Sequence, residues 1–374
     1  MKPETRFETT AIPVQAGHGG EPPKPTGFFR RVKSWAKRNE RVLWWMHSFY
    51  ALFLGFMVIL FASKGFDYAR ILAATLGGAF LVMVILFRMF GQGHQQKARV
   101  EEKRSLKLRF LGMTYVLKNL YQGMLFFVLP FYWKSSALDS INGWFVLMLG
   151  FLALLSTLDL VFDNLLMRYR VVAAVFYAVT LFACMNLVIP AFLPNVPTLV
   201  ALLTSTLLSV LGFWLLHFPL RSLQDKSTWV ILGSIAVAAM VGMYLARTAM
   251  PPVPLYVTHA GVGIGPLDDG RLELEVTRVH KGRLTDLYAV SDVVMPGGEG
   301  DSFRHVWRHV TEGQTYRADL EANVVYKGSD QTVRVMSKLP RERLDAMDPV
   351  GDWVVDIVTN DDQIVGRTRF KVIE

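Results

Sequence analysis

The sequence predicts an α-helical membrane bundle of about seven spans, with the N-terminus inside, followed by an extracytoplasmic all-β sandwich domain. Two observations lead to this fold class. The 374 residues are 52% hydrophobic and have a mean hydropathy of +0.31, which is more apolar than an ordinary soluble domain. The apolar residues also concentrate between Val42 and Leu245, whereas a period-two alternation of apolar and polar residues begins after Leu255.

The chain begins with two segments that are not predicted to span the membrane. Residues 1–27 are rich in Pro, Gly and Thr, which predicts a disordered tail rather than a signal peptide. Residues 28–41 form a basic juxtamembrane segment in which aromatic and apolar residues alternate with Lys and Arg. Two interpretations of this segment stay open: an amphipathic helix on the inner leaflet, or a charged flank that fixes the topology.

A transmembrane helical domain is predicted over residues 42–246. Its apolar stretches each approach the ~20 residues that a helix needs to cross the hydrocarbon core. The seven stretches are residues 42–63, 69–90, 110–133, 141–162, 171–192, 198–217 and 229–246.

Charge divides the chain at nearly the same boundary. Residues 1–254 hold 25 Lys and Arg against 11 Asp and Glu, whereas residues 255–374 hold 15 against 20. With the N-terminus inside, 20 basic residues lie on the inner side of the predicted spans and 4 on the outer side, as the positive-inside rule requires. We therefore expect the bacterial inner (cytoplasmic) membrane, a cytoplasmic N-terminus and a periplasmic C-terminal domain. The basic excess is explained by membrane lipids as partners, and no nucleic acid is expected, because no basic-aromatic module accompanies the charge.

A proline-containing linker is predicted over residues 247–256, and a periplasmic β-sandwich over residues 257–374. Cys184 lies in an apolar stretch and is the one cysteine of the chain, so packing rather than a disulfide must hold this domain. The predicted strands are residues 271–279, 286–294, 302–310, 315–326, 331–338, 352–359 and 363–373.

A group of polar residues inside the predicted membrane domain is the first candidate binding site, since an ionisable group there is costly without a partner. Lys118, Asn119 and Gln122 fall within the third predicted span, with Lys118 about 12 Å inside it, and Asp159 and Asp163 fall at the inner end of the fourth. A short loop joins these spans, so Lys118 and Asp159 can pair. Three interpretations stay open: a structural ion pair or a lysine that reaches the headgroups, a pocket for a lipid headgroup or small solute, and proton or ion transport.

The second candidate binding site is one face of the predicted strand 302–310. His305 and His309 share that face about 13 Å apart, with Trp307 between them, which is too far for both to hold one metal ion. Neither a metal nor a cofactor is therefore expected. Trp307 is expected either to pack in the core or to be an exposed aromatic that grips a glycan or a partner.

Four strings in the C-terminal domain resemble the family called domain of unknown function 2914: HVWRH (305–309), VRVMSK (333–338), GDWVVDI (351–357) and GRTRFKV (366–372). In the membrane half, QGMLFFVLPFYW (122–133) and FPLRSL (218–223) resemble uncharacterised bacterial multi-span proteins that often precede that domain. The resemblance implies an inner-membrane protein with a periplasmic domain. It implies no activity, substrate or catalytic residue.

Two functions are compatible with these features. The first is an inner-membrane protein of unknown specific activity that presents a periplasmic β-sandwich for binding or scaffolding in the cell envelope, with an envelope protein or polysaccharide as its partner. The second is a membrane-embedded transporter or lipid-modifying enzyme with an accessory periplasmic domain. Because motifs such as GxSxG and HExxH are absent, no catalytic residue is predicted and the first function is favoured.

Overall fold

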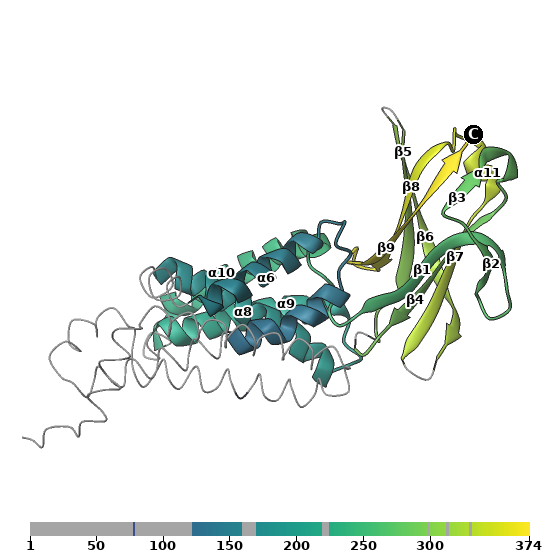
Figure 1. Ribbon diagram of the computed structural model, residues 1–374. Helices are drawn as coiled ribbons and strands as arrows, with labels where there is room; N and C mark the ends of the chain where they lie inside the picture. The colour runs from purple at the N-terminus through teal and green to yellow at the C-terminus, as the bar shows by residue number, and fades with distance from the viewer. Residues whose placement is uncertain are drawn as a thin grey trace, which may run out of the picture. The chain divides into compact units, whose positions relative to one another are not determined.

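The structure is a computed structural model that describes residues 122–158, 170–218, 224–297, 299–311, 314–328 and 331–374, together with Gly78. The chain divides into two compact units, Met1–His47 and Ser48–Glu374, and every described residue belongs to the second. Within it, apolar helices come first and a β-sheet follows (Figure 1). The predicted tail, the basic segment and the first two predicted spans lie outside the described residues.

Apolar helices make up the described part of the chain before the sheet. They are a helix over residues 122–134, α6 (Gly143–Thr157), α8 (Arg170–Phe192), α9 (Thr198–His217) and α10 (Lys226–Leu245), followed by the short 3₁₀ helix η4 (Arg247–Ala249). Three contain windows long and apolar enough to cross a membrane: Val175–Phe192, Thr198–Leu215 and Lys226–Leu245.

The expected seven-span bundle is wrong. The described residues hold six α-helices, and three of these have the length and composition of a membrane span. The apolar run 141–162 illustrates the reason, because α6 stops at Thr157, where Leu158 takes an extended backbone (φ −87°, ψ 102°). At 1.5 Å per residue, α6 covers about 22 Å, which is less than the ~30 Å of a hydrocarbon core. Apolar composition alone does not determine where a helix ends.

The helices share a core of buried apolar side chains. In that core, the Tyr132 hydroxyl donates to the backbone oxygen of Ala183 at 3.2 Å and accepts from the Asn186 side-chain nitrogen at 3.2 Å. The helix over residues 122–134 is thereby joined to α8.

A β-sheet makes up most of the chain after residue 255. Its strands are connected in the order β2-β1-β4-β7-β6-β5-β8-β9-β3, and each pair is antiparallel except β3–β9. The strands are β1 (Tyr256–Pro266), β2 (Leu272–Glu275), β3 (Arg278–His280), β4 (Leu287–Val294), β5 (Phe303–Thr311), β6 (Gln314–Lys327), β7 (Thr332–Leu339), β8 (Gly351–Thr359) and β9 (Ile364–Ile373), with the short helix α11 (Arg341–Asp345) between β7 and β8.

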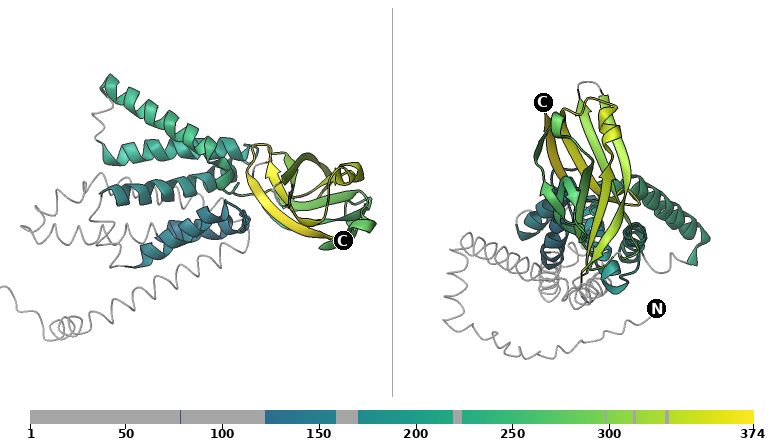
Figure 2. Two further views of the ribbon diagram at one scale, coloured as in Figure 1. Left: turned by 90° about the horizontal axis from the view of Figure 1, so that it is seen from above. Right: turned by 90° about the vertical axis from the view of Figure 1, so that its right-hand side faces the viewer.

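The expected two-layer sandwich is also wrong, because one strand connects what would have been two sheets. β6 has 14 residues. Residues 314–322 of β6 pair with β5, and residues 323–327 pair with β7, with a register shift between Val324 and Tyr326. All nine strands therefore form one curled sheet (Figure 2). The alternation of residues along a strand is the same in a sandwich and in a curled sheet, so the sequence pattern does not distinguish them.

The two edge strands of this sheet, β2 and β3, are consecutive in the sequence. Two residues, Val276 and Thr277, connect them. The backbone nitrogen of Val276 donates to Val262 of β1 at 2.8 Å, and the backbone oxygen of Thr277 accepts from Lys371 of β9 at 3.0 Å. This link therefore bonds to strands near both ends of the sheet.

The curl gives the sheet an inner face and an outer face. The inner face holds a core around Trp307, Trp353 and Phe370, with Trp353 stacked on Phe370 at 5.7 Å. On the outer face, Val306 of β5 and Ile364 of β9 pack against Ala137, which lies in the loop before α6. The outer face of β5, β8 and β9 is thus the part of the sheet that meets the helical region.

Candidate functional site

His305 and Trp307 lie on the inner face of β5, fully buried. The two ring nitrogens of His305 lie 3.0 Å from the hydroxyl oxygen of Ser291 and 2.8 Å from that of Ser337. Trp307 donates to the same Ser337 oxygen at 3.3 Å. Burial lowers the pKa of His305 to about 3, so the ring is neutral at pH 7. These contacts are those of a satisfied core histidine.

His309 is also buried on this face. Its ring stacks on Trp353 at 4.6 Å, with 10° between the planes, and its Nε2 lies 3.1 Å from the backbone oxygen of Val350. The contacts of the His309 side chain are therefore made within the sheet domain rather than with a ligand on its surface. Among the described residues, no group of three His, Cys, Asp or Glu is placed to hold a metal ion.

Most residues of the predicted intramembrane polar site lie outside the described residues. Lys118, Asn119, Asp159 and Asp163 lie outside the described residues. Gln122 is described, and its side chain is buried in the helix over residues 122–134. The pairing of Lys118 with Asp159, and the transport and enzyme functions that depended on this cluster, stay predictions.

Arginines are concentrated on the outer face of the sheet, opposite the buried histidines. Arg308 of β5 lies directly across from Arg317 of β6, and Asp356 of β8 lies directly across from Arg367 of β9. Like charges opposite each other in a sheet are unfavourable. The Arg308–Arg317 pairing is therefore a position where an added negative charge would be stabilising.

A buried carboxylate, Asp356, lies between two of these arginines. Arg367 donates to it from Nε at 2.5 Å and from Nη2 at 3.3 Å, and Arg308 donates to it from Nη2. Arg308 also has a buried Nε for which the described residues provide no acceptor. Burial, and then the positive charges of Arg367 and Arg317, lower the pKa of Arg308. Arg308 is therefore an incompletely neutralised cation.

Further ion pairs surround this centre. Arg317 binds Asp319 through two nitrogens at 2.8 Å each. Asp362 accepts from Arg304 at 2.8 Å and from Arg247, at the end of the helical region, at 3.0 Å. In the whole network, six arginines meet four aspartates, which leaves an excess of two positive charges; the members are Arg247, Arg304, Arg308, Arg317, Arg367, Arg369, Asp139, Asp319, Asp356 and Asp362.

The loop before α6 forms the opposite wall. Arg367 donates from Nη1 to the backbone oxygen of Asp139 at 2.6 Å, and Arg369 pairs with the Asp139 carboxylate at 2.7 Å. Between loop and sheet lie two neighbouring cavities of about 500 and 300 Å³, both lined by Ile141, Arg308 and Ile364. We call these two cavities together the arginine cleft.

The described residues of the segment 295–302 contact the helical region. Side chains added at Gly297 and Gly300 would collide with the backbone oxygens of Pro190 and Asn195. Asp301 accepts from the backbone nitrogen of Thr198, the first residue of α9, at 3.0 Å. Burial raises the pKa of Asp301 to about 6.

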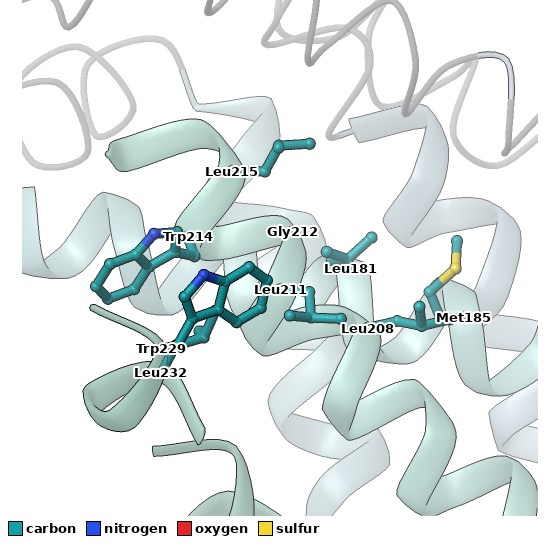
Figure 3. Close-up of a pocket in the computed structure, with 9 residues that line it drawn as sticks. All are labelled: Leu181, Met185, Leu208, Leu211, Gly212, Trp214, Leu215, Trp229 and Leu232. Atoms are coloured by element: carbon teal, nitrogen blue, oxygen red, sulfur yellow. The ribbon is translucent and has the colours of Figure 1, made fainter. Parts of the chain in front are cut away.

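A further cavity of about 300 Å³ lies among α8, α9 and α10, and Figure 3 shows side chains that line it. It offers no charged group, and its lining is almost wholly apolar, including Leu181, Met185, Leu208, Leu211, Trp214 and Trp229. This cavity suits packing with apolar groups and provides no chemistry for catalysis.

Sequence reasoning missed the arginine cleft, although a signal for it was present. In SFRHVWRHV, the alternation that places the histidines on one face places Arg304 and Arg308 on the other. In GRTRFKV, Arg367 and Arg369 likewise share a face. Two strands that each carry a pair of arginines on one face, two or four residues apart, were therefore a visible pattern; in the sheet β8 lies between them.

The comparisons with known proteins concern mainly the helical region. The model of a family of unknown function, DUF5924, matches residues 27–272. The resemblance to the domain of unknown function 2914 is therefore wrong: the matching family is a different one, and its match ends at the start of β2. The short strings behind that resemblance are alternating strand residues, which many β domains share.

No curated protein matches this sequence. Among solved structures, one match is the alkylpurine DNA glycosylase AlkC of Pseudomonas fluorescens, bound to DNA containing an abasic site analogue. It is 8% identical, the match covers 81% of this chain and 97% of that chain, and the TM-score is 0.22. A TM-score of this size carries no argument about fold or function.

Proposed function

This chain belongs to the family of unknown function DUF5924. Because the family name gives no activity, we propose a function from the residues of the chain itself: a membrane-anchored binding protein. The apolar helices hold it in the bacterial inner membrane. The sheet lies on the periplasmic side and holds an anionic group of an envelope component in the arginine cleft. The observation that carries this proposal is Arg308, a cation that faces Arg317 and keeps one buried donor without an acceptor among the described residues.

The anchor is supported by the outward side chains of the helices. On α10, large apolar residues such as Val230, Ile231, Val237 and Leu245 are exposed, which would be unfavourable in water and is favourable in lipid. In the part of the chain that the structure describes, three helices are long and apolar enough to span a membrane: α8, α9 and α10.

The periplasmic location of the sheet is supported by the residues at the two ends of these helices. The sheet contacts the first residue of α9 through Asp301 and the residues after α10 through Asp362. The opposite ends carry Arg170, at the start of α8, and Lys226, at the start of α10. In the sequence, Arg168 and Arg221 also fall beside those ends, against Lys134 and Arg247 on the sheet side. This excess of basic residues favours a cytoplasmic location for the ends away from the sheet and therefore a periplasmic location for the sheet.

Binding rather than catalysis is supported by the chemistry of the cleft. Guanidinium groups bind carboxylate and phosphate groups through paired hydrogen bonds, and they do not exchange protons at neutral pH. Asp356 is already engaged by two arginines, so it is poorly placed to act as a base. The cleft therefore suits holding an anion in place.

The anion-binding proposal can be tested by thermal unfolding of the full chain in a neutral detergent, with inorganic phosphate as the probe at constant ionic strength. A ligand that binds the folded state raises the unfolding temperature with its concentration. We expect phosphate to raise it for the wild type and not for Arg308→Gln. Arg343→Gln, at an exposed arginine on α11, is the matched control. An equal response of all three proteins would overturn the proposal.

The orientation is tested separately, by adding a protease to spheroplasts. We expect fragments of the sheet to be released while the membrane stays sealed. Protection of the sheet until the membrane is broken would place it in the cytoplasm and exclude a periplasmic binding role.

A further inference from the structure

The larger cavity of the arginine cleft has two unlike walls. Arg308 and Arg367 form the sheet side, whereas Leu138, Trp144 and Leu147 are on the helical side. A free inorganic anion would use the first wall alone. The composition of both walls together fits a molecule with an anionic part and an apolar part.

The apolar wall continues along α6 away from the sheet. Trp144 is 72% exposed, Leu147 54%, Phe151 59% and Leu154 52%. Their spacing of three, four and three residues puts them on one side of the helix, over about 15 Å. The other side of α6 is buried in the helical core through Phe145, Val146, Leu149 and Ala153.

We propose that the ligand of the arginine cleft is a membrane lipid with an anionic headgroup. Its phosphate accepts hydrogen bonds from the Arg308 guanidinium, which lines both cavities, and lies near Arg317 and Arg367. Its acyl chain lies along the exposed side of α6 that begins at Trp144. This inference rests on the proposed function and names the ligand class of the same cleft.

Charge complementarity and position both favour a lipid over a soluble anion. The excess of two positive charges in the network attracts an anionic headgroup. Trp144 lies between the arginines and the rest of the exposed side of α6, and tryptophan is enriched at the level of lipid headgroups. A soluble phosphate would gain no binding energy from the apolar side chains of Phe151 and Leu154.

The lipid is tested by native mass spectrometry of the full chain in detergent, with added phosphatidylglycerol or phosphatidylcholine. We expect one phosphatidylglycerol to be retained per chain, at an affinity roughly tenfold lower in Arg308→Gln, which corresponds to about 1.4 kcal/mol. Retention of phosphatidylcholine should be weak and the same in both proteins. Arg317→Gln leaves Arg308 and Asp356 in place and provides a second variant if Arg308→Gln folds poorly. It should also lower the affinity for phosphatidylglycerol and leave retention of phosphatidylcholine unchanged.

The apolar wall is tested with Trp144→Ala, and Trp229→Ala is the control, because Trp229 is an exposed tryptophan on α10 that lines the separate apolar cavity. We expect Trp144→Ala to reduce retention of phosphatidylglycerol, whereas Trp229→Ala should retain it like the wild type. Equal retention by the two variants would overturn the apolar wall.

The outcomes separate this inference from the proposed function. If phosphate stabilises the chain through Arg308 but phosphatidylglycerol is retained equally by the wild type and Arg308→Gln, the lipid is wrong and anion binding stands. If neither phosphate nor phosphatidylglycerol depends on Arg308, both are wrong.

Discussion

Asn142 donates a hydrogen bond of 2.7 Å from its side-chain nitrogen to the backbone oxygen of Ile364, 222 residues further along the chain. Its side-chain oxygen accepts from the backbone nitrogen of Ala137 at 3.2 Å and from the hydroxyl of Ser140 at 2.6 Å. One fully buried amide therefore connects the loop before α6 to the first residue of β9. This connection sets the distance between the two walls of the arginine cleft.

Replacing Asn142 by Leu, which has a similar volume, should destabilise the junction between loop and sheet. The backbone groups of Ile364 and Ala137 would lose their partner, and each unsatisfied buried group costs about 1–3 kcal/mol. Hydrogen exchange at the Ala137 amide should become faster. Ser136→Ala is the control, because that hydroxyl donates only to Trp133 in the same turn. Unchanged exchange at Ala137 in Asn142→Leu would show that the amide does not hold the loop.

Asp356→Asn should destabilise the sheet far more than Asp352→Asn, although both residues lie on the same face of β8. Asp356 is buried between two arginines, and removing one charge of a buried pair costs about 3–5 kcal/mol. Asp352 is exposed and pairs with Lys371 at 3.5 Å, an arrangement worth about 0–1 kcal/mol. The measurement is the unfolding temperature of each variant, and equal losses would contradict the importance of the buried carboxylate.

The burial of His305 makes the sheet sensitive to acid. Its pKa is lowered to about 3 in the folded protein, whereas an unfolded histidine titrates near 6.5. The unfolded state therefore takes up the proton first, and stability falls as the pH falls from 6.5 towards 3. Between pH 6.5 and 5 the loss should be about 2 kcal/mol. His305→Gln should flatten this part of the pH profile of the unfolding temperature, and an unaltered profile would exclude His305 as its cause.

The contribution of Asp301 to stability should have the opposite pH dependence: it should fall as the pH rises. Its folded pKa is raised to about 6 from an ordinary 3.8, so the folded state holds the proton more tightly than the unfolded state. Its contribution to stability is therefore complete below pH 3.8 and is lost as the pH rises to about 6, by at most about 3 kcal/mol.

The Asp301 prediction is measured at the start of α9. Asp301→Asn keeps an oxygen that accepts from the Thr198 nitrogen and removes the charge. Hydrogen exchange of the first amides of α9 should accelerate between pH 5 and 7 in the wild type, after correction for the intrinsic rate, and should not do so in Asp301→Asn. Glu299→Gln, on the same loop, is the control. The same acceleration in wild type and Asp301→Asn would refute the prediction.

The strands were predicted better than the sheet they form. The expected strands 286–294, 302–310 and 363–373 differ by at most one residue at each end from β4, β5 and β9. Alternation is a local property, so it is visible in the sequence. Whether strands form two layers or one curled sheet depends on the pairing of β6 with β5 and β7, which no local pattern contains.

The candidate site could be predicted only in part, for a similar reason. The sequence placed His305, Trp307 and His309 on one face of a strand, and the structure has them on one face, buried. It gave no indication that the opposite face, with Arg308, would be covered by a loop that precedes it by more than 150 residues. Which face of a strand meets another part of the protein is decided by tertiary contacts.

The two-residue link between β2 and β3 has a consequence for how the protein behaves among other copies of itself. An open sheet exposes unpaired backbone groups at its two outermost strands, where a second chain can add by hydrogen bonding and start aggregation. Here those outermost strands are four and three residues long, and Val276 and Thr277 carry the chain directly from one to the other while bonding to β1 and β9. The two edges of the sheet are therefore short and are joined by the chain itself. This leaves little edge length on which a strand of another copy can add and start a fibril.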